Sequence, residues 1–405
     1  MASPRYTFTE VLQDRWWIGA VAFAVSLVAT PILRAVAYRL RIVDRPDDLL
    51  KPHGRPVAYL GGVAMCLGLL AGLGCYVAVM SGRAEGWARL TGALAAGRTG
   101  ELLANPLWNA LAIALAASLI MVVGLLDDLK DIRPRQKVLG QIVAAAVLLA
   151  GGVGTRMAMV FFSLLPCVPP DWVVVPLSVM MCLLVVIAAC NATNLLDGLD
   201  GLCGGVTGII AFGFLALAVW LAMWGHYPGQ EEIRVGLCLA MAGAVWGFLP
   251  YNIPPASIFM GDAGSMLLGF LVATMLALFC MEGTARWLLA AVVVFALPIL
   301  DTGLAVVRRV LLGRSIFAGD RSHLYDQLVD RGLSVKQVVG LFYLLAIVFA
   351  ALGVGLAIWV RMRYAVVVYG LLLVGVWLTF RRLGMIKPEP HAPPPDPPPT
   401  EDEGR

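Results

Sequence analysis

Long apolar runs separated by short polar connections dominate the chain. Eleven runs are long enough, or nearly so, to cross a bilayer, because a spanning helix needs about 20 mainly apolar residues. We predict them at residues 16–38, 59–80, 107–126, 138–152, 172–190, 203–223, 232–249, 265–281, 287–307, 338–359 and 364–380. The fourth run is the shortest and ends at glycines. The pattern predicts an all-α fold, a polytopic membrane helix bundle of about 10–11 transmembrane helices.

Composition supports this membrane interpretation. The chain has 405 residues, of which 60% are hydrophobic and only 14% charged, and its mean hydropathy is +0.85. The strands of a membrane barrel would alternate apolar and polar residues, whereas these runs are continuously apolar. The eight cysteines are scattered, mostly inside the runs, and form no CxxC pair, so we interpret them as core residues.

The distribution of Lys and Arg predicts the orientation. These residues are concentrated in the connections that follow odd-numbered runs and after the last run. By the positive-inside rule those connections face the cytoplasm, with the N-terminus outside and the C-terminus inside. We predict an integral membrane domain over residues 1–386. Residues 387–405 are rich in Pro and end in acids, which predicts a disordered C-terminal tail.

The motif NATNLLDGLDGL at 191–202 sets amides and carboxylates directly after an apolar run. Asn191, Asn194, Asp197 and Asp200 recur at every third position, so a continuing helix would place them on one narrow stripe. The plainer interpretation is a helix end followed by a turn, because Asn, Asp and Gly are common in both.

Asp127 and Asp128 follow another apolar run, and Asp131 comes next at a spacing that predicts the same helical face as Asp127. Adjacent acids at a membrane border repel each other and favour a bound cation. Basic residues follow at once, which suits a metal and phosphates held together. Lys137 is our preferred phosphate contact, although the positive-inside rule also produces basic residues here.

The motif FMGDAGS at 259–265 places Asp262 among glycines just before a run. Glycine lets a phosphate approach the backbone closely, and the carboxylate is a hard oxygen ligand for a metal. Asn252 precedes this motif, and Phe259 offers a flat face on which a base could stack. Phe259 fits a membrane-interface aromatic equally well.

Asp301 lies inside an apolar run near its cytoplasmic end. An acid at such depth is a functional candidate by default, or it pairs with Arg308 further along the same segment.

Two further cytoplasmic loops carry candidate residues. The last loop presents Arg321, His323 and Asp326 together, which favours a functional role for His323 over a structural one. In the first loop, Lys51 either binds an anionic head group or anchors the following helix.

The order and spacing of these motifs resemble a known family. NATNLLDGLDGL, LLDDLKD followed by KVLGQ, and FMGDAGS resemble the polyprenyl-phosphate N-acetylhexosamine-1-phosphate transferases of glycosyltransferase family 4. The resemblance covers about residues 51–332. The acidic pair with its third acid, and the DAGS form of the glycine motif, look more like the undecaprenyl-phosphate N-acetylglucosaminyl-1-phosphate transferase branch.

The resemblance implies a magnesium-dependent enzyme, with manganese as an alternative, whose active site is formed by cytoplasmic loops. It would transfer a sugar-1-phosphate, expected to be GlcNAc-1-phosphate, from a UDP-N-acetylhexosamine to undecaprenyl or another polyprenyl phosphate and release UMP. By resemblance, the catalytic residues are Asp127, Asp128, Asp197, Asp200 and His323, the substrate contacts are Lys51, Lys137, Asn191, Asn252, Phe259 and Arg321, and the metal site is Asp262 and Asn194. The implied setting is the inner (plasma) membrane; a homodimer is left open, and no nucleic acid partner is expected.

Two alternatives stay open at the level of sequence. One is a phospho-MurNAc-pentapeptide transferase, and the other is a multi-span transporter. Transporter sites usually lie near the bilayer midplane, whereas the acids here gather at one border. The last loop departs from the family, because members usually have several histidines where this chain has RSHLYD with His323 alone. The identity of the sugar is therefore left open.

Overall fold

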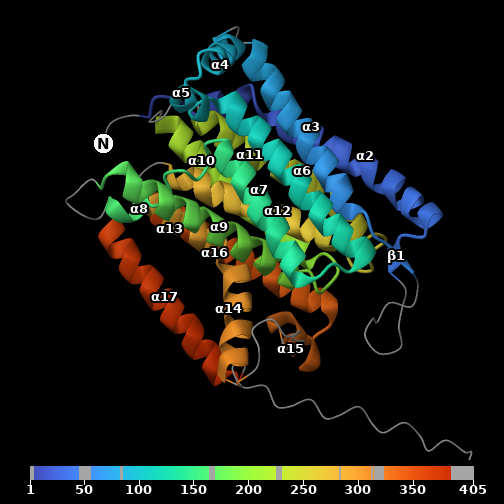
Figure 1. The fold of residues 1–405 in the computed structure, drawn as a ribbon. Helices are drawn as coiled ribbons and strands as arrows, with labels where there is room; N and C mark the ends of the chain where they lie inside the picture. Colours follow the sequence, from blue (N-terminus) through green and yellow to red (C-terminus); the bar gives the residue numbers. More distant parts are fainter. Residues whose placement is uncertain are drawn as a thin grey trace, which may run out of the picture.

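The computed structural model describes residues 4–44, 56–82, 85–163, 169–224, 230–281, 284–311, 313 and 323–384. The predicted tail at 387–405 lies outside these residues. Within them the chain is a helical bundle with a single small hairpin (Figure 1). Its elements are α1 (Phe8–Gln13), α2 (Trp16–Leu40), β1 (Val43–Asp44), β2 (Val57–Ala58), α3 (Gly61–Gly82), α4 (Glu85–Ala95), α5 (Thr99–Leu103), α6 (Pro106–Lys130), α7 (Pro134–Ala150), α8 (Met159–Phe162), α9 (Asp171–Leu196), α10 (Leu202–Trp224), α11 (Gln230–Asn252), α12 (Gly261–Cys280), α13 (Ala285–Val294), α14 (Ala296–Leu311), α15 (Leu324–Asp330), α16 (Val335–Trp359) and α17 (Met362–Arg382).

The all-α membrane fold predicted from the sequence is confirmed. Nine helices in the described part of the chain are long and apolar enough to cross a membrane, or ten if the bent pair α13 and α14 forms one span. The chain is therefore a multi-pass membrane protein. The remaining predicted span, 138–152, corresponds to α7, which has 17 residues.

Helix α7 is short, yet it runs antiparallel to the full length of α6. At one end Lys137 of α7 forms an ion pair with Asp127 of α6. At the other end Trp108 Nε1 of α6 donates a hydrogen bond to the Ala150 carbonyl of α7 at 3.0 Å. Helix α7 thus returns the chain to the far side of the bundle, from which α9 crosses back.

The ninth predicted span is broken. Helices α13 and α14 meet at a bend of 73°. Pro298 lacks an amide hydrogen, so the carbonyl of Val294 loses its helical partner, and α13 ends at that residue. The bend turns α14 away from the bundle (Figure 1).

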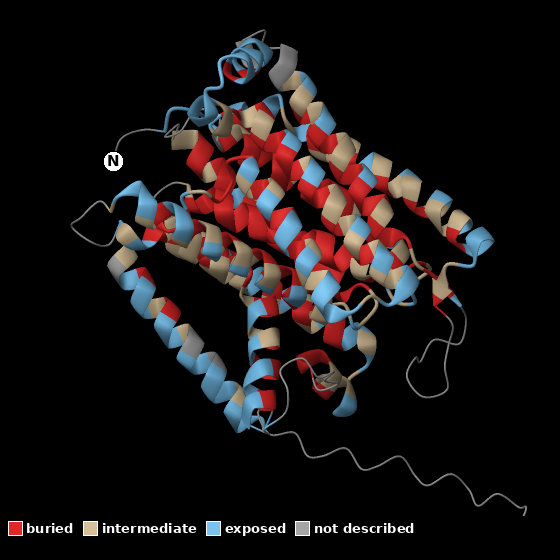
Figure 2. Ribbon diagram, viewed as in Figure 1, coloured by how far each residue is buried: buried red, intermediate tan, exposed pale blue. Residues whose placement is uncertain are grey.

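Helix α12 forms the centre of the bundle. Nearly every residue of α12 is buried, because α6, α9 and α3 pack around it. Figure 2 shows the buried residues concentrated along these central helices and the exposed ones on the outer helices. A helix that is apolar on all sides suits this position, and its N-terminal end carries the motif GDAGS.

A short antiparallel hairpin, which the hydropathy pattern did not predict, joins α2 to α3. Val43 pairs with Ala58 and Asp44 with Val57. Ala58 also forms a bridge with Ile258, so the hairpin lies directly beside the loop that leads into α12.

Candidate active site

Asp128 of α6 anchors the start of α12. Its Oδ1 accepts a hydrogen bond from the Asp262 amide at 2.8 Å, and its Oδ2 accepts one from the Ala263 amide at 3.1 Å. The first amides of a helix have no partner within the helix, and the helix dipole favours a negative charge there. Asp128 therefore fixes the position of Asp262 at the beginning of α12.

Glycines make this approach of α6 to α12 sterically possible. Gly261 has a φ of +66°, and a Cβ on it would lie 2.5 Å from Oδ2 of Asp128. A Cβ on Gly124 of α6 would lie 2.4 Å from the Asp262 carbonyl oxygen. Only glycine fits either position without displacing the backbone or the carboxylate.

Lys137 lies between two carboxylates. Its ammonium forms ion pairs with Oδ2 of Asp127 and, at 2.6 Å, with Oδ2 of Asp262. The second oxygen of Asp262 accepts a hydrogen bond from Nδ2 of Asn194 at 2.7 Å. Four predicted site residues, from α6, α7, α9 and α12, thus meet at one point.

The third acid of the α6 motif is placed differently from the prediction. Helix α6 ends at Lys130, and Asp131 is its C-cap with a left-handed φ of 47°. The predicted shared helical face with Asp127 is therefore wrong, because the helix stops one residue earlier. Asp131 instead donates its amide to the Asp127 carbonyl at 2.8 Å.

The stripe predicted over 191–200 is also wrong in its second half. Helix α9 ends at Leu196 and Asp197 is its C-cap, so only Asn191 and Asn194 are helical. The following residues form a turn in which Gly201 has a φ of +74°. The plainer alternative, a helix end followed by a turn, describes this segment.

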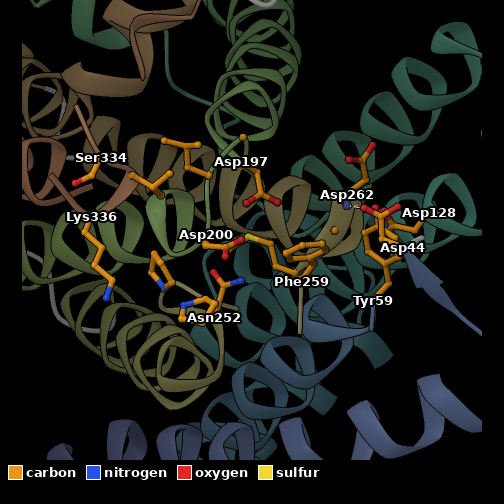
Figure 3. A pocket seen from close by; sticks show the side chains of 17 residues that line it. Asp44, Tyr59, Asp128, Asp197, Asp200, Asn252, Phe259, Asp262, Ser334 and Lys336 are labelled. Carbon is orange, nitrogen blue, oxygen red and sulfur yellow. Dashed lines mark hydrogen bonds between the residues drawn. The ribbon is translucent and has the colours of Figure 1, made fainter. Parts of the chain in front are cut away.

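Below this carboxylate cluster the described residues enclose a cavity of about 790 Å³. Five aspartates line it, together with one Lys, three aromatic or amide side chains and several apolar residues. The lining residues are Asp44, Tyr59, Asp128, Asp197, Gly198, Leu199, Asp200, Asn252, Pro254, Pro255, Phe259, Met260, Gly261, Asp262, Ser334, Val335 and Lys336. In Figure 3, Asp128, Asp262 and Asp44 lie at one end of the cavity, Asp200 and Asn252 in the middle, and Lys336 at the opposite end.

Asp200 and Asn252 hold the loops around the cavity together. Oδ2 of Asp200 accepts a hydrogen bond from the Ala256 amide at 2.9 Å. The Asn252 amide accepts from Gly201 N at 3.1 Å and donates to the Ile258 carbonyl at 3.0 Å. The turn after α9 and the loop before α12 therefore form one rigid wall.

Burial and neighbouring carboxylates perturb Asp197. Burial raises the pKa of Asp197 well above its usual value, and the nearby charges of Asp262, Asp128 and Asp200 raise it further. This end of the cavity therefore carries an excess of negative charge, which a bound cation would relieve.

Phe259 and Tyr59 form an aromatic pair on the cavity wall. Their ring centroids lie 5.9 Å apart at an interplanar angle of 59°. Burial, and the Asp44 carboxylate to which Tyr59 is hydrogen bonded, raise the pKa of Tyr59. Phe259 thus presents its ring to the cavity, as the base-stacking interpretation requires.

Two predicted substrate contacts that the structure describes, Lys137 and Asn191, do not line the cavity. Asn191 donates to the Ile187 carbonyl at 2.7 Å and to Oε1 of Gln141 at 3.3 Å, so it links α9 to α7 one turn away from Asn194. Lys51 and Arg321 lie outside the described residues.

His323 is buried beside the cavity instead of lining it. Its Nδ1 lies 2.9 Å from Oδ2 of Asp301, whose Oδ1 accepts a hydrogen bond from the Leu324 amide at 2.7 Å. His323, which was predicted to be catalytic, therefore partners the acid of α14.

Tyr325 connects His323 to the turn after α9. The His323 ring stacks on the Tyr325 ring with centroids 5.5 Å apart, and the Tyr325 hydroxyl donates to the Leu195 carbonyl at 3.1 Å. A Cβ on Gly198 would meet that hydroxyl at 2.2 Å, so Tyr325 packs directly against the turn that carries Asp197.

Comparison with known proteins agrees with this architecture. The sequence profile of "Glycosyl transferase family 4" matches residues 110–280, the part of the chain that holds α6, α7, α9 and α12. The "Probable undecaprenyl-phosphate N-acetylglucosaminyl 1-phosphate transferase" of Bacillus subtilis is 31% identical over 350 residues, which is 84% of this chain and 85% of the relative. The chain belongs to glycosyl transferase family 4.

Other relatives of this family 4 protein separate into two groups. The "Decaprenyl-phosphate N-acetylglucosaminephosphotransferase" of Mycobacterium leprae is 31% identical over 82% of the chain and 81% of its own length. The "Phospho-N-acetylmuramoyl-pentapeptide-transferase" of Geobacillus kaustophilus is 34% identical, but over only 59% of the chain and 71% of its own length. The names of the first two relatives agree with the predicted N-acetylglucosaminyl branch, and the pentapeptide transferases cover between 59% and 82% of the chain.

The donor atoms of the family 4 site suit a hard divalent cation with substrate oxygens as further ligands. No group of three or more His, Cys, Asp or Glu side chains in the described residues could hold a metal by itself. Asp127 and Asp262, however, both form ion pairs with the Lys137 ammonium, so the two carboxylates lie close enough to bind one positive charge. Mg²⁺ is usually held by one or two carboxylates plus phosphates and waters, so this pair fits such an ion.

Sequence reasoning missed three residues that line the cavity of this family 4 protein. Asp44 and Tyr59 reach it from the hairpin, and Lys336 from the start of α16. Tyr59 and Lys336 lie at the border of a predicted span and Asp44 lies in the connection between the first two spans, all on the predicted cytoplasmic side, which was the available signal. None stands in a motif, so the sequence offered no reason to choose them over their neighbours.

Proposed function

We propose that this family 4 transferase moves a sugar-1-phosphate, expected to be GlcNAc-1-phosphate, from a UDP-N-acetylhexosamine to undecaprenyl or another polyprenyl phosphate. Two relatives that match more than four fifths of the chain are named as N-acetylglucosamine phosphotransferases of undecaprenyl or decaprenyl phosphate, which supports the proposal. The observation that carries the proposal is the Asp127–Lys137–Asp262 cluster at the ends of membrane-crossing helices, beside a cavity large enough for a nucleotide sugar. A lipid phosphate and a water-soluble donor meet at such a border.

The reaction balances without a redox partner. A phosphate oxygen of the carrier attacks the β-phosphorus of the donor, the bond from that phosphorus to the bridging oxygen breaks, and UMP leaves with the electron pair. A phosphate monoester has a second pKa of about 6, so the carrier is largely a dianion at neutral pH. The site must therefore supply positive charge and alignment more than a base.

The residues divide these tasks. Lys137 neutralises phosphate charge, and Asp128 positions Asp262 by holding the start of α12. We propose that Asp127 and Asp262, with the Asn194 amide, hold Mg²⁺ (Mn²⁺ as an alternative), which would stabilise the negative charge of the pyrophosphate when bound. Asp197 and Asp200 then border the donor.

The proposal includes a location. We infer that the protein lies in the inner membrane and that the cavity opens to the cytoplasmic side. The connections at this end of the bundle carry the larger share of Lys and Arg, which favours the cytoplasmic side.

The test is release of UMP. Purified protein with Mg²⁺, undecaprenyl phosphate and a panel of UDP-sugars should release UMP when the donor is a UDP-N-acetylhexosamine. The panel includes UDP-MurNAc-pentapeptide, because UMP release with that donor would indicate the alternative, a phospho-MurNAc-pentapeptide transferase. A folded sample that releases no UMP with any donor would rule the proposal out.

A further inference from the structure

The cavity has a cationic end that the carboxylate cluster does not explain. Lys336, in the first turn of α16, is the single Lys or Arg among the described residues that line it. Figure 3 places Lys336 and Ser334 at the end opposite Asp262 and Asp128. Among the described residues, no hydrogen bond or ion pair engages the Lys336 ammonium, which leaves it available to a ligand.

The start of α16 is held firmly against the cavity wall. Oγ of Ser334 accepts a hydrogen bond from the Gln337 amide at 3.4 Å and so caps the helix. Two turns further along, the Tyr343 hydroxyl donates to the Gly201 carbonyl at 2.7 Å. Gly201 in turn is bonded to Asn252. Lys336 therefore has a defined place relative to the loops of the site.

The walls of the same cavity are suited to a flat ring. Leu199, Pro254, Pro255 and Val335 contribute apolar surface, and a Cβ on Gly201 would touch the Pro254 ring at 3.4 Å, which places that proline beside the turn. A polyhydroxy sugar needs many hydrogen-bond partners, whereas a pyrimidine base needs apolar walls and a few donors for its carbonyl oxygens.

We propose that Lys336 binds the uridine half of the donor and sets its affinity. The inference rests on the proposed UDP-sugar donor. With the diphosphate beside Lys137 and Asp262, the donor extends along the cavity, and its nucleoside reaches the α16 end. The ammonium donates to a uracil carbonyl or a ribose oxygen there and offsets the five aspartates of the wall. The lipid acceptor reacts at the opposite end and makes no contact with Lys336.

The experiment compares steady-state kinetics of the wild type, Lys336→Ala and Lys336→Arg in the full-length protein. Lys336→Ala should raise KM for the UDP-sugar about tenfold, the loss expected for one hydrogen bond from a charged donor. It should weaken product inhibition by UMP by a similar factor, with kcat and KM for undecaprenyl phosphate within about twofold. Lys336→Arg keeps the charge and should recover most of the affinity.

A matched control separates the local contact from a general charge effect. Arg331 precedes α16, is exposed and does not line the cavity, so Arg331→Ala should leave both KM values unchanged. The inference is overturned if Lys336→Ala leaves UMP inhibition unchanged, or if it raises KM for the lipid acceptor instead. Absence of turnover in the wild type would refute the proposed function itself.

Discussion

At the scale of single residues, the site depends on close contacts between α6 and the start of α12 and on specific pairs of charged side chains. Both carboxylate oxygens of Asp128 accept hydrogen bonds from amides in the first turn of α12, so Asp128 holds the start of this helix in place. Asp127 differs, since it shares the Lys137 ammonium with Asp262. Two neighbouring acids of one motif therefore have different partners.

Gly261→Ala should disrupt the anchoring of α12. A left-handed backbone costs a non-glycine residue about 1–2 kcal/mol, and the added Cβ would collide with Asp128. We expect a lower midpoint of thermal unfolding and a loss of UMP release of at least tenfold. Gly340→Ala is the control, because nothing lies within 4 Å of a Cβ there. Equal activity of both variants would contradict the anchoring role.

At the scale of elements, the bent helix α14 and the short α15 support the turn after α9. Asp301 of α14 holds His323 and the first amide of α15. Tyr325 of α15 then packs against Gly198. Asp301 does not line the cavity, but through α15 it supports the turn after α9, which does.

Asp301→Ala should destabilise the protein by about 3 kcal/mol, because it leaves a buried histidine without its partner. Thermal unfolding of the purified protein measures this loss. Thr302→Val is the matched control: the Thr302 hydroxyl has no hydrogen-bond partner among the described residues, so its removal should be neutral or slightly stabilising. A similar loss in both variants would show that the pair with His323 contributes nothing specific.

Asp326 should give α15 a pH-dependent stability. Burial is the main cause that raises the pKa of Asp326 to about 6, with smaller upward contributions from Asp301 and Asp330 and opposing ones from His323. The unfolded chain loses this proton near pH 4. The free energy of unfolding therefore falls as pH rises from about 4 to 6, and the loss persists above that window.

Asp326→Asn removes this titration and should be more stable than the wild type at pH 7.5, with a difference that shrinks towards pH 4. Unfolding midpoints of both proteins across this range test the sign. Asp330→Asn, an exposed acid at the end of the same helix, should show a smaller change. A difference that is constant with pH would contradict the assignment.

At the scale of the whole molecule, the helices α6, α7, α9 and α12 bring charged or polar side chains at their ends to one border of the bundle. Burial is the main cause of the raised pKa of Asp197, and the neighbouring carboxylates raise it further, so a cation bound there should reduce their mutual repulsion. A ligand that binds only the folded state stabilises it by mass action.

Addition of Mg²⁺ should therefore raise the thermal midpoint of the wild type, with a gain of about 2.7 kcal/mol at a hundredfold excess over the dissociation constant. Asp262→Ala should lose most of this gain as well as activity. Asp171→Asn, at the far end of α9 and with a side chain that is 79% exposed, should retain it. An undiminished Mg²⁺ effect in Asp262→Ala would remove Asp262 from the metal site.

The sequence by itself determined the class of fold and the border at which chemistry occurs. Lipid offers no hydrogen bonds to a backbone, so continuous apolar runs had to be helices, and clusters of acids were expected at their ends because charges inside the bilayer are costly. The motifs around Asp128, Asn194 and Asp262 were found in this way, and their resemblance to known motifs in order and spacing predicted the family.

Tertiary structure alone decided which partner each charged residue has. Asp128 caps α12, Lys137 joins Asp127 to Asp262, His323 pairs with Asp301, and Lys336 reaches the cavity. These contacts join positions tens to more than a hundred residues apart in the sequence, and they depend on how closely helices pack. Spacing along one helix predicts only neighbours on that helix, and it failed at Asp131 and Asp197 because the helices ended first.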